Sequence, residues 1–456
     1  MLNTTLRTGT RLIAALGVTL ALALPAAAET LTDALIAAYR NSNLLEQNRA
    51  VLRAADEDVA VALSALRPTL GLSSDVTSSN QRLDQLQASL ALSAQITVFD
   101  FGRNRLGVEV AKESVLATRE ALVNVEQQVL LSAVSAYVSV RLNQDIVALR
   151  ESNVRLIAEE LRAASDRFEV GETTRTDVAQ AEARLAAARS DLIAAQGDLL
   201  VAREDYRLAV GRYPGDLRPL PRTPAIPRSL DEARTIASRT HPLIRQAQRL
   251  VTVGQLNLER ARAQMRPTIG ASASIGANDA GEDQRSFGLQ LDQTLYAGGR
   301  LSALFRQALA SSDQSRAALL QTTLDIGQQV GAAYANVTVA NASIEAADRA
   351  IRANQTAFEG VRDEAALGAR TTLDVLDAEQ DLLSARTDRV SAEANRYVSV
   401  YALLSAMGLL TVEHLRLGIP TYDPAAYYNA VRNAPATSAQ GKRLDRVLKS
   451  IGRTSP

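Results

Sequence analysis

The chain has 456 residues, and its 50 Lys and Arg residues balance its 50 Asp and Glu residues to a formal net charge of zero. This balance gives no sign of a nucleic-acid partner. The lack of cysteine excludes disulfides, thiol catalysis, cysteine-ligated metal and a lipid on an N-terminal cysteine.

The first residues predict a secretory signal peptide. Arg7 and Arg11 precede an apolar run at residues 12–24, and the small residues 26–28 follow it. This order of charged, apolar and small residues is typical of export, and we expect cleavage after Ala28. No later segment reaches the roughly 20 apolar residues that a membrane-spanning helix needs. We therefore expect any membrane insertion to use strands.

Most of the remaining chain is duplicated. Three motifs of the first half return in the second: RPTLG at 67–71 as RPTIG at 266–270, TVF at 97–99 as TLY at 294–296, and TDV at 176–178 as LDV at 373–375. Such self-similarity indicates one structural unit present twice. We place the first repeat at residues 29–228 and the second at 229–420. Residues 421–456 form a peripheral C-terminal tail, which we expect to be flexible from residue 434.

Each repeat predicts a helix, two short strands, a very long helix, a tight turn and a returning helix. We expect helices at 31–66, 104–169, 176–210, 230–265, 301–367 and 372–407, and strands at 69–76, 90–98, 268–275 and 287–295. Residues 104–169 lack proline and contain one glycine, which predicts a continuous helix approaching ~100 Å at 1.5 Å per residue. Five prolines in residues 213–228 exclude a continuous helix there.

Each long helix is expected to stop at a glycine, Gly171 or Gly368, because glycine readily adopts the left-handed conformation that ends helices. Threonines at 173–174 and 371–372 can cap the helix that follows. Each repeat therefore predicts a long antiparallel helical hairpin.

The strands alternate apolar residues with polar or small ones, as Leu90 and Leu92 do with Ala91 and Ser93. This period fits a barrel strand with a lipid-facing side and a wet interior. Four strands cannot close a barrel, so other copies of the chain must supply the rest. Two copies would give a filled eight-stranded barrel and three copies a twelve-stranded barrel with a lumen. The small polar inward set favours three.

These features resemble the TolC-type outer-membrane efflux and secretion channels of Gram-negative bacteria. Beside the duplication, the resemblance depends on RFEVG at 167–171, TLDVLDA at 372–378 and LYAGGR at 295–300. It implies a mainly α fold with a small β part, in a homotrimer whose twelve strands form an outer-membrane barrel and whose twelve helices form a periplasmic tunnel. It also implies a passive exit duct that a periplasmic adaptor and an ABC, RND or MFS-type inner-membrane pump recruit, without cofactor or catalysis.

The resemblance assigns Asp374 and Asp377 to a periplasmic gate. Three residues apart on a helix, the two carboxylates project from one face, and in a trimer they would form two stacked acidic rings that attract cations. The simpler alternative is an ordinary solvated helix start, where acidic residues favour the positive end of the helix dipole.

The resemblance further implies a latch in which Arg370 holds a neighbouring chain at Thr176 and Asp177. Ala365 stands where the family has the tyrosine of a companion latch. The hairpin tips, Val170, Gly171, Leu367 and Gly368, correspond to adaptor contacts, or they serve only as helix C-caps.

Phe99, Phe101 and Tyr296 lie at predicted strand-to-helix junctions, where they could form an aromatic girdle at the membrane interface or simply pack. The histidines, His241 and His414, suggest neither a metal cluster nor a catalytic triad. We therefore expect no enzyme. Two other classes remain open: a structural or adhesive trimeric coiled-coil rod anchored by a small barrel, and a periplasmic adaptor, against which the duplicated hairpins argue.

Overall fold

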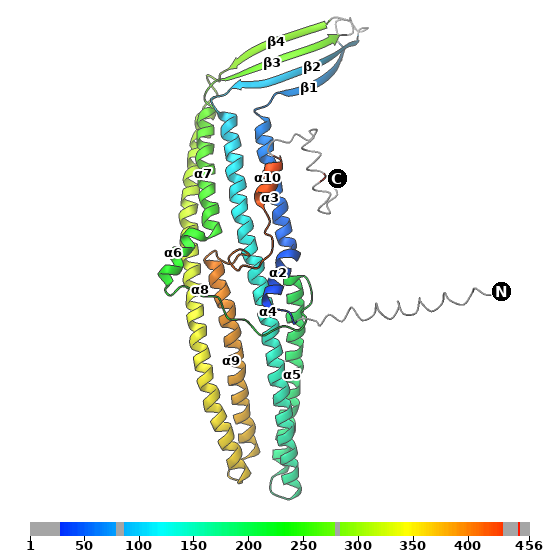
Figure 1. Cartoon of the computed structure of the whole chain (residues 1–456), viewed down its shortest axis with the longest axis vertical. Coiled ribbons are helices and arrows are strands. Elements are labelled where there is room, and N and C mark those ends of the chain that lie inside the picture. Colours follow the sequence, from blue (N-terminus) through cyan, green and yellow to red (C-terminus); the bar gives the residue numbers. More distant parts are fainter. Residues whose placement is uncertain (1–27, 79–85, 279–282, 432–445, 447–456) are drawn as a thin grey trace, which may run out of the picture. The chain divides into compact units, whose positions relative to one another are not determined.

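The computed structural model describes residues 28–78, 86–278, 283–431 and 446 (Figure 1). Its elements are α2 (Leu31–Asn41), α3 (Asn43–Ser64), β1 (Thr69–Ser78), β2 (Leu86–Phe99), α4 (Arg103–Glu169), α5 (Arg175–Val210), α6 (Leu230–Thr240), α7 (Pro242–Ala263), β3 (Thr268–Asn278), β4 (Asp283–Asp292), α8 (Arg300–Ala366), α9 (Thr372–Ala406) and α10 (Pro424–Val431). Apart from Ala28 and Arg446, the predicted signal peptide and the predicted flexible end lie outside the described residues.

The element order repeats, as the sequence predicts. The long helices α4 and α8 each have 67 residues, without interruption at their interior glycines. Each is followed by a tight turn and a returning helix, α5 or α9. Within the described ranges, no helix combines the length and the apolar character that crossing a membrane requires.

The two helices that open the repeats, predicted at 31–66 and 230–265, are each broken by one residue. Ser42 separates α2 from α3 with φ −68° and ψ 112°, and His241 separates α6 from α7 with φ −66° and ψ 124°. At His241 the cause is the next residue, Pro242, which disfavours helical geometry in the residue before it. Ser42 adopts the same extended conformation without a following proline.

The four strands form one antiparallel sheet in the order β1-β2-β3-β4, so that β2 and β3 join the two repeats. The register aligns Leu72 with Leu92 and Leu92 with Ile275, which places the apolar side chains on one face. The opposite face carries small and polar residues, where Gly71 aligns with Ser93 and Ser93 with Ser274. The predicted alternation is thus confirmed, although β4 ends at Asp292, before Leu295.

Both faces of this sheet are exposed in the single chain. Leu70 and Leu72 in β1 and Phe287 in β4 each keep more than two thirds of their surface. In the described chain β1 and β4 are edge strands, each with one strand partner. An unpaired edge presents a row of free backbone donors and acceptors, which favours pairing with another chain.

The described chain separates into two compact units that cut across the repeats. One unit contains residues 130–225 and 336–401 together with the start of the chain up to Ser42, and the other contains 43–129, 226–335 and the segment from Ala402 onward. Each unit takes segments from both repeats. The repeats are therefore units of sequence rather than units of packing.

The start of the C-terminal tail is docked on α3 and α4. The Tyr427 hydroxyl donates to Glu57 Oε1 at 2.9 Å. The Arg119 guanidinium lies 5.6 Å from the ring centre of Tyr428, within the range of cation–π attraction. These contacts hold α10 against α3.

Asp56 is buried beneath this docked segment. The residue is 1% exposed, its carboxylate oxygens accept no hydrogen bond from the described residues, and Arg119 Nη2 lies 4.0 Å from Oδ1. Burial raises the pKa of Asp56 to about 6, with the Arg119 charge opposing the rise. An ionised carboxylate at this position therefore destabilises the fold at neutral pH.

Asp56→Asn should stabilise the protein at pH 7.5 by up to about 3 kcal/mol, because the charged form is disfavoured only in the folded state. The folded-state pKa is raised, so the cost of ionisation grows between pH ~4 and 6 and disappears below the unfolded pKa. Thermal unfolding in detergent at pH 7.5 and pH 3.5 measures this difference. Asp58→Asn, at an exposed position of the same helix, is the control; an equal gain at both pH values would contradict the prediction.

Candidate functional site

The two hairpin tips have the same backbone structure. After α4, the N–H of Gly171 donates to the Phe168 carbonyl at 3.0 Å, and the N–H of Glu172 donates to the Arg167 carbonyl at 2.9 Å. This pair of bonds is the Schellman motif, which requires a left-handed residue, and Gly171 has φ +80°. After α8 the pattern recurs: Gly368, with φ +77°, bonds to Ala365 at 3.1 Å, and Ala369 bonds to Glu364 at 2.9 Å.

The returning helices also begin alike. Thr174 caps α5 in a capping box, in which its hydroxyl accepts from the Asp177 N–H and the Asp177 carboxylate accepts from the Thr174 N–H. Thr371 and Asp374 form the same contacts at the start of α9, at 3.2 and 2.9 Å. The threonine caps predicted from sequence are thus confirmed at Thr174 and Thr371. Asp177 and Asp374 are equivalent positions of the two repeats.

The capping contacts keep both aspartates ionised. Hydrogen bonds from Thr173 and Thr174 lower the pKa of Asp177, and the backbone and hydroxyl of Thr371 lower the pKa of Asp374. The helix-start role weighed for Asp374 is therefore present in the single chain. This capping role of Asp374 is compatible with a role in a ring of charges, because a capping carboxylate at an exposed tip stays negative.

Asp377 makes a different contact from Asp374. Its carboxylate is paired with the Arg184 guanidinium of α5, and the side chains of both residues are about half exposed. This ion pair ties α9 of the second hairpin to α5 of the first. The two predicted ring aspartates are thus one turn apart on α9 but have separate partners.

The predicted latch residues are not in contact within one chain. The Arg370 Nε donates to Glu364 Oε2 at 2.9 Å across its own turn, and this contact raises the pKa of Arg370. Thr176 is exposed at the start of α5, beside the capping aspartate Asp177. The latch that the resemblance implies would join two chains, so it stays a prediction.

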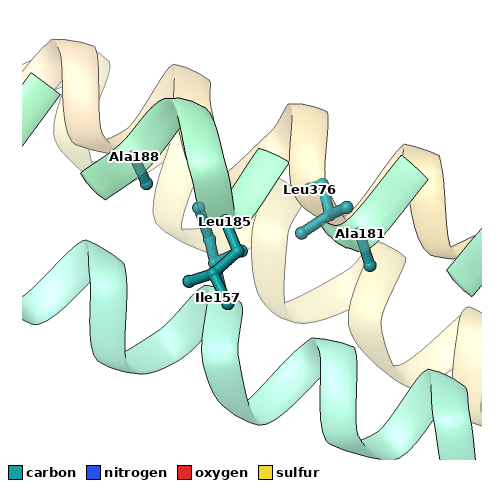
Figure 2. Close-up of a cluster of buried hydrophobic side chains, with 5 residues drawn as sticks. All are labelled: Ile157, Ala181, Leu185, Ala188 and Leu376. Atoms are coloured by element: carbon teal, nitrogen blue, oxygen red, sulfur yellow. The ribbon is translucent and has the colours of Figure 1, made fainter. Parts of the chain in front are cut away.

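Near the tips, the two hairpins pack against each other through small and branched side chains. Figure 2 shows the cluster: Ile157 of α4 lies against Leu185 of α5, and Leu376 comes from α9, between the two predicted ring aspartates in sequence. Ala181 and Ala188 complete the cluster. The alanines allow close helix approach, which brings the polar residues of α9 next to those of α4 and α5.

A buried polar pair lies on the same helices. Glu379 of α9 and Asn153 of α4 are 6% and 4% exposed, and the Asn153 Nδ2 donates to Glu379 Oε1 in a short hydrogen bond. Burial raises the pKa of Glu379, which the Asn153 bond partly offsets and the nearby Glu160 increases. This pair and the Arg184–Asp377 pair are both contacts of α9 with the first hairpin.

The exposed tips carry apolar side chains. Val170 is 71% exposed and Leu367 is 86% exposed, each directly before the glycine that ends its helix. A Cβ atom added at Gly171 or Gly368 would meet nothing within 4 Å, so these glycines are required by their positive φ and not by crowding within the chain. Ala365, in contrast, is buried against Val375 and Leu382 and is not available to replace a latch tyrosine.

The three aromatic residues at the strand-to-helix junctions differ in their contacts and exposure. Phe99 and Phe101 form an edge-to-face pair with ring centres 4.7 Å apart, and the Arg266 guanidinium lies 5.2 Å from the Phe101 ring. Tyr296 is almost fully exposed. The packing role weighed for these residues thus applies to the two phenylalanines, whereas nothing in the described chain covers Tyr296.

His241 is a helix-capping residue. It is 4% exposed, its Nδ1 accepts from the Leu243 N–H at 3.2 Å, and burial lowers its pKa to about 4. It is therefore neutral at physiological pH. Within the described residues, no group of three or more His, Asp or Glu side chains is arranged to hold a metal ion.

Sequence reasoning missed Arg184, Asn153, Glu379 and Glu364. None belongs to a motif, because the first three meet partners more than 190 positions away. Glu364 could have been found, since it precedes Arg370 by six residues across a predicted turn.

Comparisons with known proteins agree with this architecture. The family model described as "Outer membrane efflux protein" matches residues 35–212 and 235–409. The outer membrane efflux protein BepC of Brucella suis is 36% identical over 90% of this chain and 91% of its own, and the alkaline protease secretion protein AprF of Pseudomonas aeruginosa is 29% identical over 69% and 68%. Crystal structures of CusC match with a TM-score of 0.76 and 22% identity, over 83% of this chain and 92% of that one.

Asn153→Ala should destabilise the protein by about 1.5–3 kcal/mol at pH 7.5, because it removes the hydrogen-bond donor to a buried ionised carboxylate. The folded pKa of Glu379 is already raised, and losing Asn153 raises it further. The loss is therefore full above the folded-state pKa of Glu379 in the variant, and it fades as the pH falls below the folded-state pKa of Glu379 in the wild type. In a Glu379→Gln background, the destabilisation caused by Asn153→Ala should be only roughly 0.5–1.5 kcal/mol. Thermal unfolding of the four proteins tests this, and an equal loss in both backgrounds would refute it.

Proposed function

This chain belongs to the outer membrane efflux protein family, and we propose that it is a trimeric outer-membrane channel that serves as the passive exit duct of an efflux or type I secretion system. It extends into the periplasm, where an adaptor and an inner-membrane pump of the ABC, RND or MFS type recruit it. The pump supplies the free energy, so the duct itself has no reaction to catalyse and needs no cofactor. The relatives named for efflux and for protease secretion support both classes of cargo.

The observation that carries this proposal is the exposed four-stranded sheet. Its edge strands β1 and β4 lack a second partner in the described chain, and its apolar face has no cover. In lipid, backbone groups must be paired, and only a closed sheet pairs them all. Three copies would provide twelve strands with the apolar face towards lipid and the small polar face towards a lumen. The exposed Tyr296 and the Phe99–Phe101 pair would lie at the periplasmic membrane interface.

A duct explains the helices better than a solid coiled-coil rod. The rod needs a continuous apolar seam, whereas α5 buries mostly alanines and carries charged residues on its other faces. Ion pairs such as Arg150–Asp191, between α4 and α5, line the outside of the hairpin with charge. Family membership favours the same choice.

The gate of the proposed duct lies at the hairpin tips. Asp374 and Asp377 of three chains would form two acidic rings, and its capping contacts keep the Asp374 ring negative. Arg370 would reach Thr176 and Asp177 of the neighbouring chain and would exchange its Glu364 contact for theirs. The exposed Val170 and Leu367, beside Gly171 and Gly368, would receive the adaptor.

The purified protein should form trimers that conduct ions across planar bilayers, with a preference for cations. The double variant Asp374→Asn and Asp377→Asn should move the reversal potential in a salt gradient towards zero, because it removes six negative charges from the entrance. Asp198→Asn, an exposed change on α5, should leave the reversal potential as it is. A monomer in detergent, or a trimer that passes no ions, would overturn the proposed function.

Arg370→Ala and Asp177→Asn should each raise the conductance of the closed channel. Each variant loses one charge-assisted contact of about 1.5 kcal/mol per chain, and each such loss raises the open population roughly tenfold. Asparagine keeps an oxygen for the α5 cap, so the second change removes charge and leaves the helix start intact. Glu364→Ala is the matched control, because it frees Arg370 without removing it and should not open the channel. If Glu364→Ala opens the channel as well, the relevant contact is the one within the turn.

A further inference from the structure

Glu29, the residue that follows the predicted cleavage site, is buried although it carries a charge. It is 8% exposed, and a buried carboxylate destabilises the fold unless it is paired. Its Oε1 accepts from the Tyr206 hydroxyl at 2.7 Å and from Arg212 Nη2 at 2.7 Å, and its Oε2 accepts from the Gly215 N–H at 3.4 Å. Both carboxylate oxygens are therefore used.

The backbone of Glu29 is paired as well. Its N–H donates to the Asp216 carbonyl at 2.6 Å, and its carbonyl accepts from the Arg218 N–H at 2.9 Å, in a parallel bridge opposite Leu217. The Tyr137 hydroxyl of α4 lies 3.1 Å from the Glu29 carbonyl oxygen and 2.7 Å from the Arg218 carbonyl oxygen. Tyr137, Tyr206, Arg212 and residues 215–218 thus surround one residue, and we call them the N-terminal socket.

The helix that follows, α2, fixes the position of Glu29. α2 begins with the Thr30–Asp33 capping box, directly after Glu29. At its other end the Asn41 amide donates to the Val210 carbonyl, and a Cβ atom on Gly211 would lie 2.7 Å from Asn41 Cβ. Because α2 is fixed against the end of α5, position 29 cannot shift along the socket without moving that helix.

We infer that Glu29 is the first residue of the mature chain and that the N-terminal socket binds its free terminal amine, so that removal of the signal peptide completes this part of the fold. The inference depends on the export that the proposed function requires. Residues 211–218, which follow α5 and include the start of the proline-containing segment 213–228, would then be held in place by the new chain end.

The chemistry of cleavage favours the docked state. Hydrolysis of the Ala28–Glu29 bond consumes one water, whose hydroxyl goes to the Ala28 carbonyl carbon and whose hydrogen goes to the Glu29 nitrogen. Below the usual α-amino pKa of ~7.7–8.0 this nitrogen takes up a further proton and becomes an ammonium. An ammonium keeps the hydrogen bond to the Asp216 carbonyl and makes it charge-assisted, which strengthens it. In a chain in which other residues still precede Glu29, the Glu29 nitrogen belongs to a peptide bond and donates only as a neutral amide.

The test compares exported full-length proteins after purification in detergent. One variant inserts Gly-Ser-Gly between Ala28 and Glu29, which keeps the cleavage motif and adds three residues before the socket. A second is Arg212→Ala, and Tyr206→Phe replaces it if that protein does not fold. Arg203→Ala, an exposed arginine of α5 outside the socket, is the control. The readouts are N-terminal sequencing, the rate of trypsin cleavage after the exposed Arg222, and single-channel conductance.

The wild type should begin at Glu29. The insertion and Arg212→Ala should each accelerate cleavage after Arg222 by about tenfold, since each removes a charge-assisted contact of the socket. Arg203→Ala should match the wild type. A mature chain that starts elsewhere, or an extended chain as resistant as the wild type, overturns the inference even when the channel conducts. Loss of conductance in the wild type counts against the proposed function and not against the socket.

Discussion

The rest of this structure depends on a sheet that one chain cannot complete. β1 and β4 are edge strands in the described chain, and the aligned residues Leu72, Leu92 and Ile275 present an apolar surface that none of the described elements covers. Unpaired edges favour association, and the hydrocarbon of a membrane tolerates only closed sheets. This requirement explains why identical chains should assemble.

The two helical hairpins end in tips that share the same local structure. The same Schellman motif ends α4 and α8, and the same capping box starts α5 and α9. Rigid ends of this kind hold Asp374 and the tip residue Leu367 in defined positions. The contacts of α9 through Asp377 and Glu379 join the second hairpin to the first.

Sequence reasoning succeeded where a feature depends on neighbouring residues. The 67-residue helices, the helix-ending glycines and the threonine caps were all readable, because propensity and capping act over a few positions. It failed at Ser42, where a helix breaks without a proline, and it missed the docking of Tyr427 and Tyr428 on α3 and α4. These features depend on what packs nearby, which a local pattern does not contain.

The sequence alone determined the duplication, the hairpins, the alternating strands and the family. Each of these depends on the period of apolar residues, the spacing of particular residues or a short motif, all of which are visible in the sequence. Only the tertiary structure decided which polar side chains far apart in the sequence meet. Arg184 with Asp377, Asn153 with Glu379, and Glu29 with Arg212 are joined across more than 180 positions. Such pairs form because helix packing brings distant parts of the backbone together. No local sequence pattern indicates which distant residue a polar side chain will contact.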